Sequence, residues 1–359
     1  MTQESSETWQ DLDEAALTVL VACHSRGSLN CNELSELLTC KISDASLFER
    51  LQRAGLLEHL RGRYSVTQSG RELLDRVLEG IEQQITPDHP DYVRRHRREA
   101  PSIPFEANTV WAEAICINYR VDPQALRPII PDVFDLDCCH GKSFISVTAS
   151  RLKDFGISRV PNALRMNFYQ CTYRAHVTYT DFRGRTMKGC YFVRCETNSQ
   201  LMSLAANMLP EFRAHRCNTY PILMARHGGH LCLTVDTADD PGGNLVLVSD
   251  TSNPKSSMPD TSVFRSTEEA RRLIVDFYDA FAYHPETNEV LILRIDRGDW
   301  NIRIIEPTDY YLGYFNNGPF HSENAELDSI FYFQDCPYRW LPLLKERIPH
   351  GRHAANPSG

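Results

Sequence analysis

Residues 165–197 read RMNFYQCTYRAHVTYTDFRGRTMKGCYFVRCET, and this stretch decides the fold. It has two arms that are rich in aromatic and β-branched residues, as β-strands commonly are. Between the arms lies DFRG, residues 181–184, and Asp and Gly are residues that suit a tight turn. The stretch therefore predicts a long antiparallel hairpin that turns at residues 181–184.

The first arm of this hairpin also predicts a ligand site. Side chains alternate between the two faces of a strand, so Gln170, Arg174 and His176 share one face, whereas Cys171 and Tyr173 share the other. A guanidinium can hold a carboxylate through two parallel hydrogen bonds. If the first face points inward, Gln170, Arg174 and His176 form a polar trio that binds a ligand.

The remainder of the C-terminal half is predicted to be mostly strands with few helices. We expect helices over 198–209, with an apolar stripe, and over 266–283, where Ser266 and Glu269 have capping-box spacing. The Asp122-Pro123 pair predicts a third, short helix after a strand. Antiparallel strands with few helices favour a nearly closed barrel around a cavity. The predicted strands cover 110–121, 142–155, 230–237, 244–250, 289–296 and 300–307.

The N-terminal residues 12–85 predict three helices, a two-stranded wing and a fourth helix. This order, and the phrase LQRAGLLEHLRGRYSVTQSG at 51–70, resembles a winged helix-turn-helix domain. The resemblance implies DNA contacts from the third helix and from the wing. The segment holds more acidic than basic residues, however, and phosphate neutralisation dominates DNA affinity, so a protein-contact or structural role is the leading alternative. The predicted DNA-binding residues are Arg50, Arg53, Arg61 and Arg63.

The chain of 359 residues is therefore expected to be an α+β protein with two domains. These are a winged helix at 1–85 and an antiparallel β-barrel with peripheral helices at 105–347, with a Pro/Arg-rich linker at 86–104 and a flexible tail at 348–359. A net charge of -9 excludes polyanion binding by the molecule as a whole.

Charge and apolar patterning predict a cytoplasmic protein. The start lacks the pattern of a secretory signal, and no apolar run approaches the roughly 20 residues that cross a bilayer. The 12 cysteines have no regular spacing and are expected to be reduced. His227 and His230, with His215 and Cys217 upstream, lack the support of a metal motif. We expect no metal, no cofactor and no membrane contact.

Three further stretches suggest a family. NYRVDPQALRPIIPDVFDLD at 118–137 and GKSFISV at 141–147 precede the hairpin, and NSQLMSLAANMLP at 198–210 follows it. Together they resemble the acetoacetate-decarboxylase-like superfamily, and most closely its uncharacterised bacterial branch, often described as a domain of unknown function. The resemblance implies a β-barrel with a central cavity. Arg174 matches an arginine that recurs in that branch.

The same resemblance implies that the family reaction is lost. In true acetoacetate decarboxylases the helix after the hairpin carries an Arg-Glu pair and leads to Phe-Pro-Lys-Lys, whose first lysine forms a Schiff base with the β-keto acid. With the proline aligned at Pro210, the lysine position holds Glu211, which cannot form an iminium ion. Three further positions depart from that chemistry: Leu204 and Ala205 replace the Arg-Glu pair, and Gln170 replaces a strand glutamate.

Three functions follow from these patterns. The favoured one is a protein whose barrel binds a small, carboxylate-bearing molecule and acts as a ligand-responsive regulator through its winged helix. The second is an enzyme of altered chemistry, with Glu211 as general acid or base because burial raises the pKa of a carboxyl, and with Arg174 or Arg213 orienting a small carbonyl or carboxylate substrate. The third is an interaction protein. Arg213 joins the trio as a ligand-binding residue, and DNA and a second copy of the chain are open as partners.

Overall fold

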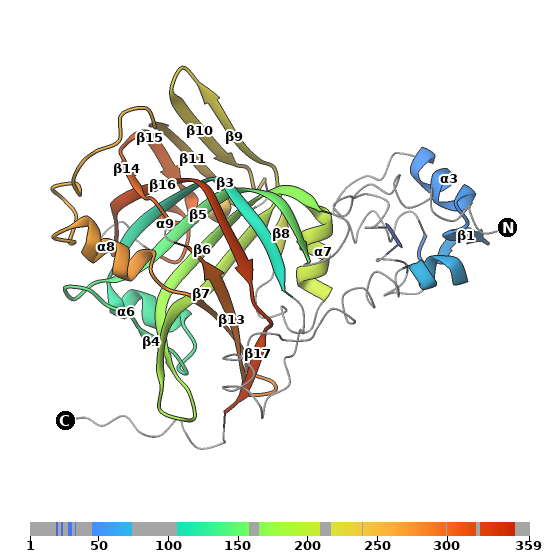
Figure 1. The fold of residues 1–359 in the computed structure, drawn as a ribbon, viewed down its shortest axis with the longest axis horizontal. Coiled ribbons are helices and arrows are strands. Elements are labelled where there is room, and N and C mark those ends of the chain that lie inside the picture. Colours follow the sequence, from blue (N-terminus) through green and yellow to red (C-terminus); the bar gives the residue numbers. More distant parts are fainter. Residues whose placement is uncertain are drawn as a thin grey trace.

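The computed structural model describes residues 19–20, 23, 28–30, 33, 45–73, 106–157, 165–208, 217–238, 240–298, 300–320 and 324–348 (Figure 1). The fold is mostly sheet with few helices. In the part of the chain covered by these ranges, no helix combines the length and the apolar character needed to cross a membrane.

The described N-terminal residues contain a helix and a hairpin. Helix α3, Ala45–Arg53, precedes strands β1, Leu57–Leu60, and β2, Arg63–Val66, which pair in antiparallel fashion with Leu57 opposite Val66. The turn at Arg61 and Gly62 has positive φ at both residues, 53° and 78°. This hairpin lies where the wing is predicted. Most of the other three predicted helices fall outside the described residues, so the winged helix stays a prediction.

Seven strands of an 11-stranded sheet form what we call the strand ring. They pair in the order β16-β3-β5-β6-β7-β12-β13, and β13 pairs again with β16, from Ile295 opposite Trp340 to Arg297 opposite Tyr338. The order of pairing therefore returns to its first strand. The bounds are β3 Ala107–Val121, β5 Ser143–Ile157, β6 Met166–Thr180, β7 Thr186–Thr197, β12 Asp279–His284, β13 Glu289–Arg297 and β16 Ala325–Trp340.

Four short strands extend the sheet at the sides of the ring. Strand β4 pairs with β6, β8 with β7, β14 with β16, and β17 with β13. Their bounds are β4 Asp135–Leu136, β8 Cys217–Thr219, β14 Arg303–Ile305 and β17 Leu344–Arg347.

The predicted hairpin is present as β6 and β7. Asp181 starts its turn, because its Oδ1 accepts hydrogen bonds from the backbone N–H groups of Arg183 and Arg185 at 2.9 and 2.8 Å. Strand β12 then lies parallel to β7, with Asp279 opposite Gly189. A Cβ at Gly189 would lie 2.3 Å from the carbonyl oxygen of Asp279, so this close pairing requires glycine there.

A second sheet packs beside the ring, at the top of Figure 1. Its strand order is β15-β11-β10-β9, and the pair β10–β11 is the hairpin predicted at 230–250. Helix α9, Gly313–Asn316, follows β15 and stacks the ring of Phe315 on Tyr119 of β3 at 3.8 Å. The bounds are β9 Ile222–His227, β10 His230–Val235, β11 Leu245–Asp250 and β15 Pro307–Leu312, with the 3-10 helix η4, Pro241–Gly243, before β11.

The short helices follow the predicted capping residues, with one correction. Asp122 caps α6, Pro123–Leu126, which continues into the 3-10 helix η1, Arg127–Ile129; helix α7, Gln200–Met208, lies inside the predicted range. The helix predicted over 266–283 is wrong beyond Ile274: helix α8 covers Thr267–Ile274, and β12 begins at Asp279. Residues 279–284, DAFAYH, instead form the strand that joins β7 to β13 in the ring.

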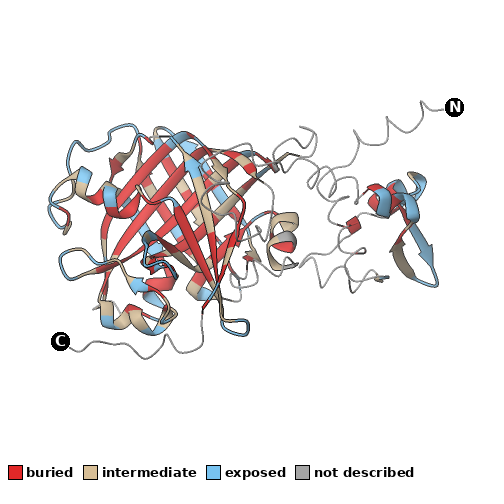
Figure 2. Ribbon diagram, turned by 60° about the horizontal axis from the view of Figure 1, so that its bottom comes forward, coloured by how far each residue is buried: buried red, intermediate tan, exposed pale blue. Residues whose placement is uncertain are grey.

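The ring strands have two different faces. One face carries large apolar side chains and packs against the second sheet, α6 and α9. The opposite face, which we call the polar face, carries polar side chains in the middle of its strands, most of them small and buried. Figure 2 shows the buried residues concentrated in these long strands. The polar face consists of Cys116, Asn118, Ser146, Thr148, Gln170, Thr172, Arg174, His176 and Ser329.

Candidate ligand site on the polar face

A row of hydrogen-bonded side chains crosses four strands of the polar face. Asn118 of β3 donates from Nδ2 to Ser329 Oγ of β16 at 3.2 Å. Ser146 of β5 donates to Asn118 Oδ1 at 2.7 Å, and its Oγ lies 2.7 Å from His176 Nε2 of β6. Buried polar groups are tolerated when they have such partners, so this row is a stable polar lining.

His176 is a buried, neutral member of this lining. It is 1% exposed, and its ring meets Phe277 edge to face at 5.4 Å. Burial, together with the charge of Arg174, lowers its pKa to about 3, although a backbone hydrogen bond with Leu273 opposes the shift. The structure thus places His176 on the predicted face, where it is bonded to Ser146.

Arg174 lies at the centre of the polar face. Its Nε donates to Thr172 Oγ1 at 2.8 Å. Its guanidinium lies 5.3 Å from the ring centroid of Trp111, on β3, and 5.5 Å from that of Phe192, on β7. Strands β3 and β7 lie on opposite sides of the β5–β6 pair. Side chains from both reach one guanidinium, so the sheet curves around Arg174 and the polar face is concave.

Arg174 lacks an acidic partner in the described ranges, where no carboxylate lies within 4.0 Å of its guanidinium. Several other arginines of this half have an acidic partner: Arg194 is paired with Glu196 and Asp240, and Arg294 with Asp279. Taking a charge out of water costs free energy unless it is paired. The two aromatic rings offset part of that cost. The half-buried guanidinium is therefore positioned to accept an anion.

Gln170, the third member of the predicted trio, lies on the same face. Its Nε2 lies 3.5 Å from Cys195 Sγ of β7, and the side chain is half-buried. The structure thus brings Gln170, Arg174 and His176 onto one face, as strand alternation predicts. Glu211 and Arg213 lie outside the described residues, so their places in the site stay predictions.

A second buried charge cluster, on the opposite face, was missed by sequence reasoning. Arg194 Nε donates to Glu196 Oε1, and its Nη1 donates to Asp240 Oδ2 at 2.7 Å. Burial raises the pKa of Glu196 to about 7 in spite of Arg194. The register of β6 and β7 shifts after Tyr173, which lies opposite Arg194. This bulge moves both side chains to the apolar face, and simple alternation cannot predict it.

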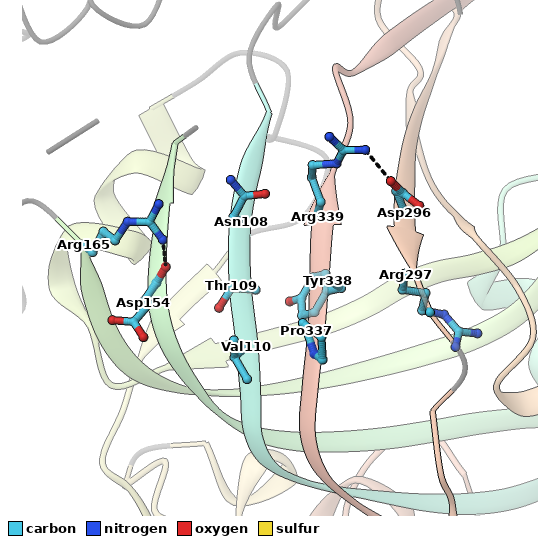
Figure 3. Close-up of a pocket in the computed structure, with 11 residues that line it drawn as sticks. Asn108, Thr109, Val110, Asp154, Arg165, Asp296, Arg297, Pro337, Tyr338 and Arg339 are labelled. Atoms are coloured by element: carbon cyan, nitrogen blue, oxygen red, sulfur yellow. Dashed lines mark hydrogen bonds and ion pairs between the residues drawn. The ribbon is translucent and has the colours of Figure 1, made fainter. Parts of the chain in front are cut away.

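A pocket of about 490 Å³ opens where β3, β13 and β16 lie side by side (Figure 3). Arg165 and Asp154 lie at one side of it, and Arg339 and Asp296 at the other. Tyr338, in its wall, accepts a hydrogen bond from Trp111 Nε1 at 3.0 Å. The guanidinium of Arg174 lies against the ring of Trp111, so Trp111 connects Arg174 with Tyr338 in the pocket wall.

The described lysines are exposed or half-buried. Lys188 is paired with Asp137 at 2.9 Å with its side chain 59% exposed, and Lys255 is paired with Glu306. None of the five lysines in the described ranges is buried; Lys188 lies opposite Thr178, at the end of the strand face that carries Arg174 and His176, where it is exposed and held by Asp137. An amine that condenses with a ketone needs a lowered pKa, which burial in an apolar pocket commonly provides.

The remaining predicted residues are dispersed. His227 and His230 lie opposite each other at the exposed β9–β10 turn and belong to no group of metal-ligating atoms in the described part of the chain. Cys217 is a free thiol, 3.4 Å from Cys195 Sγ.

The four arginines predicted to bind DNA differ in their contacts. Arg50 and Arg53 are exposed at the end of α3, and Arg61 lies in the hairpin turn. Arg63 is held by Glu33 at 2.9 Å and by Ser28, so it ties the hairpin to an earlier segment. DNA binding stays a prediction.

The curved strand ring, the second sheet beside it and the buried polar lining define a mostly-sheet protein with a candidate small-molecule site. A model of the DUF2071 family, described as an uncharacterized conserved protein, matches residues 108–335. The chain belongs to this family, in agreement with the uncharacterised branch predicted from its motifs.

Solved structures with a similar course of the chain include the acetoacetate decarboxylase of Legionella pneumophila, with 12% identity, a TM-score of 0.42, and 69% of this chain and 87% of that chain covered. An acetoacetate decarboxylase-like enzyme from Sphingomonas wittichii RW1 has 12% identity, a TM-score of 0.41, and coverages of 67% and 90%. The enduracididine biosynthesis enzyme MppR, complexed with pyruvate, has 13% identity, a TM-score of 0.41, and coverages of 69% and 91%. Such similarities assign no activity. Among curated proteins, no sequence matches this chain.

Proposed function

We propose that this protein binds a small carboxylate-bearing molecule, without covalent attachment, in a β-barrel whose interior is the polar face. The observation that carries the proposal is Arg174: a half-buried guanidinium on a concave face, with one hydrogen bond to Thr172 and no carboxylate within reach in the described ranges. A ligand carboxylate supplies the missing counter-charge, and its two oxygens match the geometry of the guanidinium.

The surroundings of Arg174 suit a ligand with a small apolar body. Trp111 and Phe192 flank the guanidinium, and Gln170 offers an amide on the same face. Because His176 is neutral, Arg174 is the charged group among the three predicted side chains of this face. In this proposal the pocket at Tyr338 is the entrance for the ligand.

A regulatory role has one supporting contact. Leu204 of α7 is 7% exposed and belongs to the same apolar cluster as Leu47 and Leu51 of the N-terminal segment. Helix α7 directly follows β7, which contributes Phe192 beside Arg174. The contact between α7 and the N-terminal segment would have to exist in two arrangements. A ligand would act on the N-terminal segment only if the protein bound it with different affinity in the two arrangements.

A thermal-shift series with the full chain tests the binding proposal. Small 2-oxo and 3-oxo acids, including pyruvate and acetoacetate, are compared with neutral analogues such as pyruvamide. A matching acid at 100 times its Kd stabilises the folded state by about 2.7 kcal/mol. We expect such a shift for at least one acid and not for its amide. Equal thermal shifts with an acid and its amide would contradict the proposal. The proposal would also fail if no acid gave a shift and native mass spectrometry of protein from its own cells found no retained small molecule.

A further inference from the structure

Three different metal-ligating side chains meet outside the polar face. Cys139 and His140 precede β5, and Glu269 lies in the first turn of α8. His140 Nε2 lies 2.9 Å from Glu269 Oε1, and Cys139 Sγ lies 3.9 Å from the same oxygen. One ligand atom from each residue lies within 4.8 Å of the others. A thiolate, an imidazole and a carboxylate are the three ligand types that zinc takes in proteins.

A tight turn fixes the first two residues. Cys139 N donates to Lys142 O at 2.9 Å, and Lys142 N donates back to Cys139 O at 3.0 Å. Between them His140 and Gly141 both have positive φ, 48° and 74°. Two successive positive φ values define a two-residue hairpin turn, in which the backbone has little freedom. The positions from which Cys139 and His140 project are therefore set by the turn and not by a ligand.

The start of α8 fixes the third residue. Glu269 Oε2 accepts a hydrogen bond from Arg265 N at 2.6 Å, and Ser266 Oγ accepts one from Glu269 N at 3.2 Å. These bonds leave Oε1 directed to His140 and Cys139. The hydrogen bond from Arg265 is also the main reason why the pKa of Glu269 is lowered, so this group is a carboxylate at neutral pH.

Three carboxylates act on the thiol of Cys139, although Asp137 is also paired with Lys188 and Asp328 with Arg120. Burial raises the pKa of Cys139, and the carboxylates of Glu269, Asp137 and Asp328 raise it further. A divalent cation between Cys139, His140 and Glu269 would interact favourably with the carboxylate of Glu269 and would stabilise the thiolate of Cys139. All three side chains are partly exposed, which leaves an approach for an ion and for a water molecule.

We propose that Cys139, His140 and Glu269 form a binding site for a zinc-class divalent cation, with water as the fourth ligand. On binding, Cys139 releases its thiol proton to solvent and coordinates through Sγ. His140 coordinates through the lone pair of Nε2 while its proton stays on Nδ1, and Glu269 coordinates through Oε1. No electron is transferred. This site differs from the His227–His230 arrangement considered in the sequence, because its ligands are 130 residues apart along the chain.

The test is titration of the full, metal-stripped chain with ZnCl₂ by calorimetry and with CoCl₂ by absorption spectroscopy. We expect one Zn²⁺ per chain and a thiolate-to-cobalt charge-transfer band. Cys139→Ser, His140→Asn and Glu269→Gln should each weaken Zn²⁺ binding by at least about 100-fold, because loss of a supporting group alone costs 10–100-fold. Asn at position 140 tolerates the left-handed turn, so this variant keeps the backbone.

Cys138→Ser is the matched control, since Cys138 is the adjacent exposed thiol and lies outside the group. Its affinity should equal that of the unmodified chain. Absence of stoichiometric Zn²⁺ binding would overturn the proposal, as would a cobalt complex without the thiolate band. Loss of binding in Cys138→Ser but not in Cys139→Ser would do the same. Circular dichroism of each variant separates loss of the site from loss of the fold.

Discussion

Replacing Arg174 by glutamine is expected to weaken binding of the matching carboxylate by at least about 30-fold, which corresponds to about 2 kcal/mol. The guanidinium supplies both the charge and the paired donors, and glutamine supplies neither. Isothermal titration with the acid that gives the largest thermal shift measures the change. Lower salt should strengthen binding to the unmodified chain and leave the Arg174→Gln variant nearly unaffected, because only the former forms an ion pair.

The stability of the ligand-free variant distinguishes a binding residue from a structural one. Arg174 has no acidic partner in the described ranges, so its removal breaks no ion pair there, and we expect an unfolding free energy equal to or above that of the unmodified chain. Arg183→Gln is the control, since Arg183 is an exposed arginine in the β6–β7 turn and lies outside the polar face and the pocket; it should bind the acid as the unmodified chain does. If the Arg174→Gln variant bound the carboxylate as tightly as the unmodified chain does, Arg174 would not be the residue that binds it.

Replacing His176 by glutamine is expected to reduce the dependence of the unfolding free energy on pH below pH 6.5. The pKa of His176 is about 3 in the folded chain and about 6.5 when unfolded, so below pH 6.5 the unfolded state binds the extra proton. The contribution of this neutral histidine is therefore complete above pH 6.5 and is lost as pH falls towards 3. Linkage gives a loss of about 2 kcal/mol between pH 6.5 and 5.

Urea unfolding at pH 7.5 and pH 5 measures this difference. Glutamine can still bond to Ser146 from the position of Nε2, so His176→Gln should fold but lack that part of the pH dependence. His230→Gln, at an exposed histidine of the β9–β10 turn, should keep the profile of the unmodified chain. An unchanged slope in His176→Gln would mean that His176 is protonated in the folded state.

Local patterns in the sequence predict the features that depend on neighbouring residues. The Asp181 turn, the Asp122 cap and the shared face of Gln170, Arg174 and His176 all follow from turn chemistry, capping preference or strand alternation. Each requires only residues that are close along the chain.

Features that depend on distant strands could not be predicted in this way. Residues 275–283 continue the apolar pattern of α8, and only pairing with β7 and β13 makes 279–284 a strand. A bulge in the β6–β7 pair decides the face of Arg194 and Glu196. Whether Arg174 has a counter-ion depends on the side chains that all the remaining ring strands place near it.

The central claim is that the polar face holds its carboxylate ligand by an ion pair at Arg174 and not by a Schiff base. The direct test is to saturate the full chain with the acid that binds, confirm the complex by native mass spectrometry, add sodium borohydride, denature, and measure the intact mass. We predict the mass of the unmodified chain, because no described lysine is buried, and Lys188, at the end of the strand face that carries Arg174, is exposed and paired with Asp137. A mass increase that survives denaturation and maps to a lysine would contradict the account.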